Sequence, residues 1–190
     1  MDYIRIRHPE KIKYDLYYPL LLAVLFCVIF GLLPAAPKIF NDQGLIKHIT
    51  GMLQILTGFY IASLAAIATF NKEGMDSKMQ GEPPKLTTWR FGRTEVVELT
   101  RRRFLCLMFG YLSFLSFLLY FIGIGGMLSY ENVKIVFQIK YHFWIKWGFV
   151  FCYLFLLSNL VITTLLALYY MADRIHRVDS ELQGGIDETK

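Results

Sequence analysis

The residues most suited to chemistry are the bases and aromatic rings between positions 87 and 103, where the sequence reads TTWRFGRTEVVELTRRR. Guanidinium groups pair with carboxylates and phosphates, and aromatic side chains in a short loop can anchor a protein contact. We therefore predict that this segment docks a soluble protein and touches anionic lipid headgroups. The residues assigned to this docking surface are Trp89, Arg90, Phe91, Arg93, Arg101, Arg102 and Arg103.

The same mixture of bases and aromatic rings also occurs in proteins that bind single-stranded nucleic acid. Here the loop that carries it, 71–103, is too short to form a nucleic-acid-binding fold of its own. We expect no direct binding of nucleic acid.

Residues that could carry catalysis are few and scattered. The four histidines lie in separate segments, at positions 8, 48, 142 and 176. The three cysteines, Cys27, Cys106 and Cys152, lack the CxxC spacing of metal and redox sites. Glycines at 123, 125 and 126 resemble a phosphate-binding loop in composition alone, because they lie within an apolar run. We expect no enzymatic activity and no bound metal or cofactor.

The elements that must position the docking residues are apolar. Hydrophobic residues make up 55% of the 190-residue chain, and charged residues only 18%, against about a quarter in soluble domains. Four windows, 16–37, 49–71, 104–130 and 147–172, contain no Asp, Glu, Lys, Arg or His. About 20 helical residues cross a hydrocarbon core of ~30 Å. The pattern predicts an all-α integral membrane protein, a bundle of four transmembrane helices.

The charge pattern also predicts the segments between these helices. The expected transmembrane spans are 17–33, 49–70, 104–127 and 147–170. Residues 1–16 are expected to lie on the inner leaflet, 34–48 and 128–146 to form outer loops, 71–103 to form a basic cytoplasmic loop, and 171–190 to form a cytoplasmic tail.

Lysine and arginine predict the orientation. Segments 1–16, 71–103 and 171–190 hold fifteen of these bases, and the two outer loops hold five. Because Lys and Arg accumulate on the cytoplasmic side, both termini and the loop 71–103 are expected to be cytoplasmic. The three consecutive arginines then mark the inner leaflet, where each base gains roughly 1 kcal/mol from anionic lipid.

The third helix is expected to begin well before its transmembrane part. Thr94 can cap a helix, and Glu95 and Glu98 would lie in the first turn, where the helix dipole favours acids. At 1.5 Å per residue, such a helix would project on the order of 15 Å from the membrane before Phe104.

The outer loop 128–146 has a period of two. Odd positions from Val133 to Phe143 are apolar, and the even positions between them are mostly polar. This alternation predicts a short β-strand or hairpin in the outer loop. An interfacial helix that leads into the fourth span is the alternative.

Two features of the spans suit helix packing. Gly58, Ala62 and Ala66 recur every four residues, which lets helix backbones approach closely, either within one subunit or between copies of a closed cyclic homo-oligomer. Asn159, near the centre of the fourth span, needs a hydrogen-bond partner. That partner lies either within one subunit or in a ring of amides that could line a pore.

Two functions follow from these features. The first is a non-enzymatic membrane platform that oligomerises and docks a cytoplasmic effector protein, reporting a membrane event to it. The alternative is a homo-oligomeric pore that permeabilises the inner membrane. A pore usually has a polar stripe along a whole helix, and the fourth span offers only Ser158, Asn159, Thr163 and Thr164.

The four spans, the cytoplasmic ends and the basic loop between spans two and three resemble the KwaA family, the membrane subunits of the Kiwa bacterial anti-phage defence system. The segment TEVVELTRRRFLCLMFGYLSF is part of this resemblance. The resemblance implies a homo-oligomeric sensor of phage infection in the bacterial inner membrane. It also implies a cytoplasmic DNA-binding subunit as the partner, acting against phage replication. It assigns a role to no individual residue.

Overall fold

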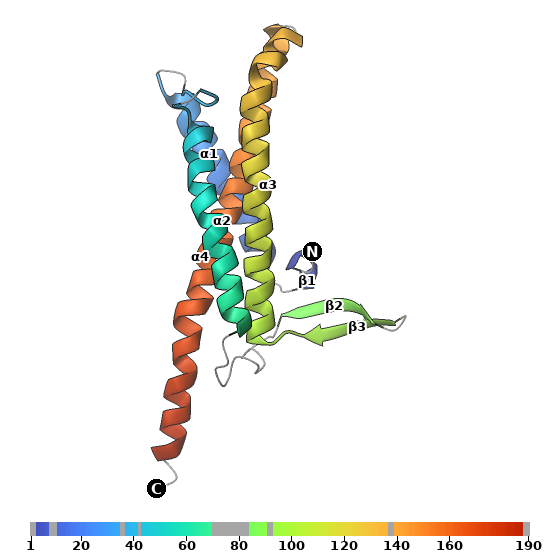
Figure 1. Ribbon diagram of the computed structural model, residues 1–190, viewed down its shortest axis with the longest axis vertical. Coiled ribbons are helices and arrows are strands. Elements are labelled where there is room, and N and C mark those ends of the chain that lie inside the picture. Colours follow the sequence, from blue (N-terminus) through green and yellow to red (C-terminus); the bar gives the residue numbers. More distant parts are fainter. Residues whose placement is uncertain are drawn as a thin grey trace.

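Four long helices and a small antiparallel sheet make up the fold (Figure 1). The computed structural model describes residues 3–7, 11–34, 37–41, 43–69, 84–90, 93–136 and 139–187. The helices are α1 (Tyr18–Leu32), which follows the short π-helix η2 (Lys13–Tyr17), α2 (Leu45–Thr69), α3 (Arg101–Val136) and α4 (Ile139–Asp187).

Four helical stretches are long and apolar enough to cross a membrane: α1 taken together with η2 (Lys13–Leu32), and parts of α2, α3 and α4. The four apolar helices predicted from the charge-free windows are therefore confirmed, although α2, α3 and α4 run beyond the expected spans. We call the end of the bundle where α2 ends and α3 begins the arginine end. The opposite end, where α3 ends and α4 begins, is the far end.

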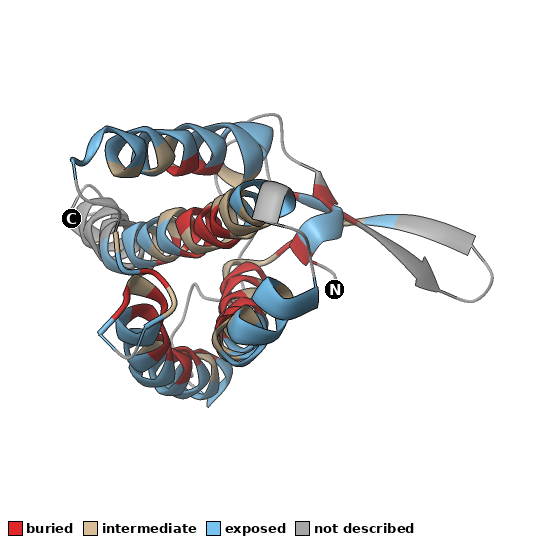
Figure 2. Ribbon diagram, turned by 90° about the horizontal axis from the view of Figure 1, so that it is seen from above, coloured by how far each residue is buried: buried red, intermediate tan, exposed pale blue. Residues whose placement is uncertain are grey.

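The helices pack in the order α2, α3, α4, α1. Side chains between them form the core, and Figure 2 shows buried residues facing the interior of the bundle with exposed residues outside. Helix α1 is the least covered, because it buries only Pro19 and Ala23. The largest fully buried residues of the other helices include Leu53, Tyr60, Phe109, Leu112, Leu119 and Leu160.

Hydrogen bonds between side chains join the helices inside this core. The hydroxyl oxygens of Thr57 on α2 and Ser116 on α3 lie 2.8 Å apart. Those of Tyr60 on α2 and Thr164 on α4 lie 2.6 Å apart. Buried polar groups in an apolar surrounding need such partners. These residues therefore stabilise the packing of one chain.

The sheet lies at the arginine end and has the strand order β1-β2-β3. Its strands are β1 (Ile6–Arg7), β2 (Lys85–Arg90) and β3 (Arg93–Glu98), and both pairings are antiparallel. In the longer pairing, Lys85 lies opposite Glu98 and Arg90 opposite Arg93. Figure 1 shows this hairpin projecting sideways from the helices.

The predicted start of the third helix near Thr94 is wrong. Residues 93–98 form β3, and α3 begins at Arg101. β-branched residues such as Thr87, Thr88, Val96 and Val97 favour strands. The register leaves two residues, one of them glycine, to connect β2 and β3, and this is a typical hairpin pattern. The hairpin therefore takes the place of the projecting helix.

The predicted strand in the outer loop is also wrong. Residues 133–136 belong to α3, and residues from Ile139 onward belong to α4. A lone strand has no neighbour to pair its backbone, whereas a helix satisfies its own backbone hydrogen bonds. The helical alternative is therefore closer to the structure. Phe137 and Gln138, which connect the two helices, lie outside the described residues.

Candidate docking site at the arginine end

The sheet is fixed to the bundle at its base. Leu86 of β2 and Leu99, just after β3, are fully buried, and the Leu99 backbone N–H donates to the Pro84 carbonyl over 3.1 Å. Farther along the hairpin, the side chain of Val96 is 62% exposed. The base of the hairpin thus belongs to the core, while Val96 of β3 is open to another molecule.

The strand order makes β3 an edge strand over its whole length, while the two-residue β1 is the edge strand on the other side of β2. Within the described residues β3 pairs only with β2, whereas β2 lies between β1 and β3. Backbone N–H and C=O groups along an open strand edge can pair with a strand of another chain. This edge is the part of the described structure best suited to bind an extended protein segment.

The N-terminal segment ties the sheet to the helices. Ile6 of β1 pairs with Leu86, and the adjoining 3-10 helix η1 (Tyr3–Arg5) places the Tyr3 ring against the ring of Tyr111 on α3. The two rings are stacked, with centroids 4.6 Å apart and planes at 22°. Tyr3 and Ile6 are both buried, so this segment belongs to the core and not only to the surface as expected.

Polar groups gather around Tyr3. Its hydroxyl donates to Oδ1 of Asp15 over 3.2 Å, and the Lys11 ammonium lies 3.5 Å from Oδ2 of the same carboxylate. Lys11 also donates to the carbonyls of Tyr3 and Ile4. The Lys11 side chain thus connects η1 with the helical residues that begin at position 11.

Asn159 of α4 completes this arrangement. Its Nδ2 donates to the Asp15 backbone carbonyl over 2.7 Å, and its Oδ1 accepts from the Tyr111 hydroxyl over 2.8 Å. We call Tyr3, Lys11, Asp15, Tyr111 and Asn159 the polar cluster. It joins the N-terminal segment, α3 and α4 at one point.

Burial dominates the electrostatics of the polar cluster. It raises the pKa of Tyr3, and the negative charge of Asp15 raises it further. Burial lowers the pKa of Lys11, while the attraction of Asp15 partly offsets this effect. Charged forms are disfavoured where water is excluded. Tyr3 therefore acts as a neutral hydrogen-bond donor.

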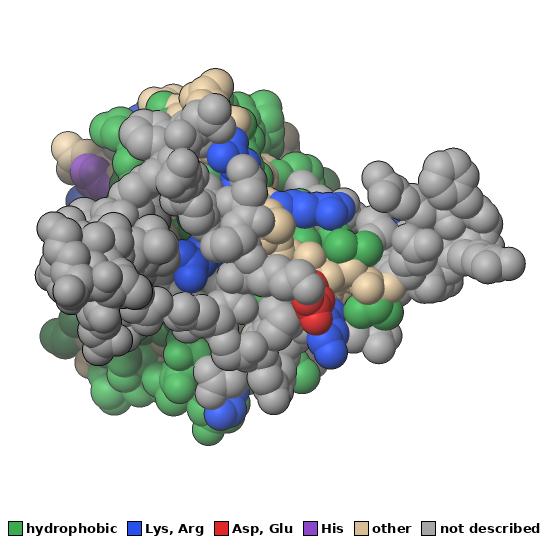
Figure 3. All heavy atoms as spheres, turned by 90° about the horizontal axis from the view of Figure 1, so that it is seen from below, with side chains coloured by type: hydrophobic (Ala, Val, Ile, Leu, Met, Phe, Trp, Pro, Cys, Tyr) green, Lys and Arg blue, Asp and Glu red, His purple; other side chains and the backbone are tan. Residues whose placement is uncertain are grey.

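The three arginines occupy different environments around the start of α3. Nη1 of Arg102 lies 3.5 Å from the Ala68 carbonyl in the last turn of α2, where a cation is favourable. Arg101 is partly buried and Arg103 is exposed. Figure 3, which views this end of the molecule, shows Lys and Arg side chains on several sides of it.

Thr100, and not Thr94, is the N-cap of α3. Its carbonyl accepts from the Phe104 N–H over 3.0 Å, and its hydroxyl oxygen accepts from the Arg103 N–H at 3.4 Å. The cap sets where the helix begins. Arg101 to Arg103 therefore lie in the first turn, directly beside the base of the hairpin.

The remaining docking residues are described only in part. Trp89, Arg90 and Arg93 lie on the strands next to the hairpin turn, and their side chains are outside the described part of the structure. Phe91 lies entirely outside it. The backbone positions of Trp89, Arg90 and Arg93 therefore lie on one hairpin. The docking roles of their side chains stay a prediction.

The small-residue face of α2 points away from the rest of the chain. Gly58, Ala62 and Ala66 are all exposed, and a Cβ added at Gly58 would meet nothing within 4 Å. These residues therefore do not mediate packing within one chain. A contact between copies stays a prediction.

Sequence reasoning missed two features of the bundle. The Lys11–Asp15 pair, four residues apart just before an apolar span, was the available signal for the polar cluster. Gly123 lets α3 approach its neighbours, because a Cβ there would lie 2.8 Å from Thr50 Cγ2 and 2.9 Å from the Tyr153 hydroxyl. The sequence pattern did not separate Gly123 from Gly125 and Gly126 in the same apolar run.

A scan against protein-family models, a search of curated proteins and a search of solved structures found no match to this chain.

Proposed function

We propose that this protein is a non-enzymatic membrane platform that docks a cytoplasmic effector protein through its sheet. In this proposal the four helices span the bacterial inner membrane, copies of the chain form a homo-oligomer, and both termini and the loop 71–103 are cytoplasmic. The excess of bases in these segments supports the orientation.

The observation that carries the proposal is that the hairpin is fixed to the bundle at its base. Its base is buried at Leu86 and Leu99, β3 has an open edge in the described sheet, and the arginines of the first turn of α3 adjoin it. A firmly held strand edge loses little freedom when a partner binds, which favours affinity. Bases and aromatic residues in the same segment supply further contacts.

The polar cluster supplies a route from the membrane to this edge. β1 pairs with β2, and the segment that contains β1 is held by Tyr111 of α3 and, through Asp15, by Asn159 of α4. A shift between α3 and α4 would therefore move the residues that hold the sheet. We propose that the platform reports a membrane event in this way.

The pore alternative has less support. The amide of Asn159 uses both its oxygen and its nitrogen within one chain, and the hydroxyls of Thr57 and Tyr60 are paired across helices. The open face of α2 carries small residues such as Gly58 and Ala62 instead of a polar stripe. The described residues therefore favour the platform.

The resemblance to the KwaA family adds a biological setting to this proposal. We propose that the platform takes part in anti-phage defence and that its effector binds DNA, so that the membrane chain itself needs no contact with nucleic acid. Anionic lipid headgroups are the proposed second partner of the arginines.

Co-purification with the soluble protein encoded beside this chain tests the proposal. The full-length protein, extracted in mild detergent, is compared with a variant that combines Trp89→Ala and Arg93→Glu. We expect the variant to lose the partner, because it removes an apolar anchor and reverses a charge at the hairpin. Membrane insertion and oligomer size should stay as in the unmodified protein.

A matched variant at the far end controls for general damage. Trp144→Ala with Lys38→Glu also removes one exposed aromatic ring and reverses one exposed base, and it should keep the partner. Unchanged partner binding by the Trp89 and Arg93 variant would place docking elsewhere, on the segments 1–16 or 171–190.

A further inference from the structure

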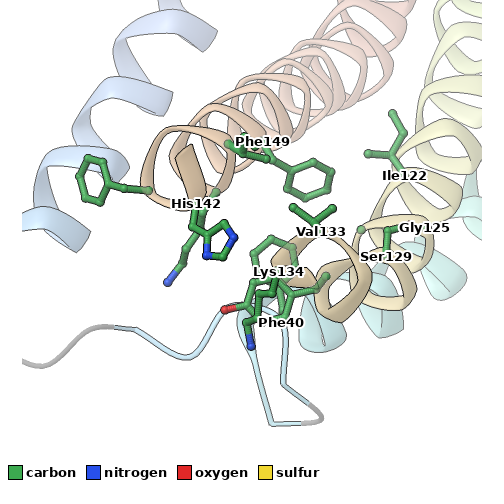
Figure 4. A pocket seen from close by; sticks show the side chains of 13 residues that line it. Phe40, Ile122, Gly125, Ser129, Val133, Lys134, His142 and Phe149 are labelled. Carbon is green, nitrogen blue, oxygen red and sulfur yellow. The ribbon is translucent and has the colours of Figure 1, made fainter. Parts of the chain in front are cut away.

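A cavity of about 470 Å³ opens at the far end, between α3, α4 and the loop before α2. Figure 4 shows its labelled side chains coming from these three segments, with Val133 of α3 and Phe149 of α4 approaching one another across the gap. Its apolar wall is formed by Phe40, Ile122, Val133, Phe143, Ile145 and Phe149. A volume in this range suits a small ligand or part of a lipid molecule.

Small residues on α3 create this space. Gly125, Gly126 and Ser129 line the cavity on one side of the helix. A Cβ at Gly126 would collide with the ring of Phe149, so the absence of a side chain at this position leaves room for the ring. At Gly125, by contrast, a Cβ would meet nothing within 4 Å, so the space beside it is open.

Aromatic stacking holds the third wall in place. The Phe40 ring stacks on Tyr130 of α3, with centroids 4.4 Å apart and planes at 10°, and lies 5.5 Å from the Phe149 ring. These contacts fix the loop before α2 against α3 and α4. The cavity is therefore formed by packed residues on three of its sides.

The polar lining of the cavity is basic. Lys134, His142 and Lys146 contribute side chains to it, and none of the described residues that line it is acidic. Lys134 donates to Oε1 of Glu131 over 2.9 Å and lies 4.2 Å from the Tyr130 ring centroid. An exposed ion pair of this kind is weak, and an ammonium group has three donors, so Lys134 can also bind an anion.

The position of the cavity matches a membrane interface. On α3, the stretch from Phe104 to Tyr130 carries no charge, and Lys134 follows it. On α4, Lys146 directly precedes the uncharged stretch 147–172. Exposed aromatic side chains adjoin it on α4, with Phe143 at 62% exposure and Trp144 at 74%. Such aromatic residues are typical of the headgroup level of a bilayer.

We propose that this cavity binds an anionic phospholipid of the leaflet at the far end. Its acyl chain lies against the apolar wall, and its phosphate lies near Lys134 and Lys146. The charge of the lining selects an anionic over a zwitterionic headgroup, and the apolar wall selects a lipid over a free phosphate. The inference depends on membrane insertion of the helices but not on the docking of a soluble partner.

Photo-crosslinking tests this site on the full-length chain in phosphatidylcholine nanodiscs. A trace of phosphatidylglycerol with a photoactivatable acyl chain is added, and labelled peptides are mapped by mass spectrometry. We expect labelling within 122–149. Unlabelled phosphatidylglycerol should compete, while phosphatidylcholine and inorganic phosphate should not. Equal labelling by a phosphatidylcholine probe, or competition by inorganic phosphate, would overturn the proposal.

Two pairs of variants sharpen the test. Lys134→Gln with Lys146→Gln should lower labelling by roughly tenfold, whereas Lys38→Gln, an exposed lysine outside the cavity, should not. Gly125→Leu should fill the cavity and reduce labelling, while Gly148→Leu, on α4 and outside the cavity, should not. Unchanged labelling in both cavity variants would show that the lipid lies elsewhere.

Discussion

The hydroxyl of Tyr111 on α3 donates to Oδ1 of Asn159 on α4 over 2.8 Å, and the Tyr111 ring stacks on Tyr3. One residue thus connects a helix-to-helix contact with the N-terminal segment that pairs with the sheet. A shift of α4 relative to α3 would alter the hydrogen bond between Tyr111 and Asn159.

Asn159→Leu is expected to destabilise the bundle by on the order of 1 kcal/mol, because the Tyr111 hydroxyl and the Asp15 carbonyl would both lose a partner. Thermal unfolding in detergent measures the effect. Ser113→Ala is the control, since the described hydrogen bond of Ser113 goes to Phe109 of its own helix. If both variants unfold at the same temperature, the hydrogen bonds of the Asn159 amide add nothing to the stability of the bundle.

Tyr3→Ala is expected to loosen the sheet while the four helices stay folded. The change removes the stack on Tyr111 and the hydrogen bond to Asp15, which together hold β1 in position. Hydrogen exchange should become faster in β2, the neighbour of β1, and should stay unchanged in the middle of α2 and α3.

The control for this variant is Ile4→Ala. Ile4 lies next to Tyr3 but is 66% exposed, so its truncation should leave exchange in β2 unchanged. Equally fast exchange in both variants would mean that the N-terminal segment as a whole, and not the Tyr3 contacts, protects the sheet.

Gly58→Leu is expected to weaken a homo-oligomer by a kcal/mol or more without harming the fold of one chain. Gly58 faces outward with open space beside it, so only close approach of a second copy would be blocked. Gly123→Leu should instead destabilise the fold of one chain by about 1–3 kcal/mol, because a Cβ at this position would collide with Thr50 and Tyr153.

Native mass spectrometry separates these two outcomes. The unmodified protein should give one oligomer, and Gly58→Leu should shift it toward smaller species with an unchanged unfolding temperature. A monomer for the unmodified protein would contradict the assembly.

Cysteines introduced at Lys78 and Lys134 are expected to label from opposite sides of sealed vesicles. The expectation follows from the distribution of bases, because Lys78 lies in the loop 71–103 and Lys134 near the end of α3. Labelling is followed with a membrane-impermeant maleimide, in a background where Cys27, Cys106 and Cys152 are replaced by alanine. Reaction from the same side would contradict the topology.

The four apolar helices could be predicted from the sequence alone. A helix in a bilayer satisfies its own backbone hydrogen bonds, so composition and length are enough to predict it, and each charge-free window coincides with one of α1 to α4. The periodicity of individual residues was less informative. Alternating residues at 133–143 indicated a strand, but α3 and α4 extend through most of them as helices.

The positions of the strands and the partners of the polar residues depend on contacts between distant parts of the chain, so the sequence pattern did not predict them. The segment 93–98 has helix-capping and strand-forming residues alike, and pairing with β2 makes it a strand. Asn159 needed a partner, but nothing near it in sequence could show that Asp15, 144 residues away, would supply one. Such contacts depend on how helices stack in space. Local sequence fixes what each helix requires, and packing fixes which neighbour provides it.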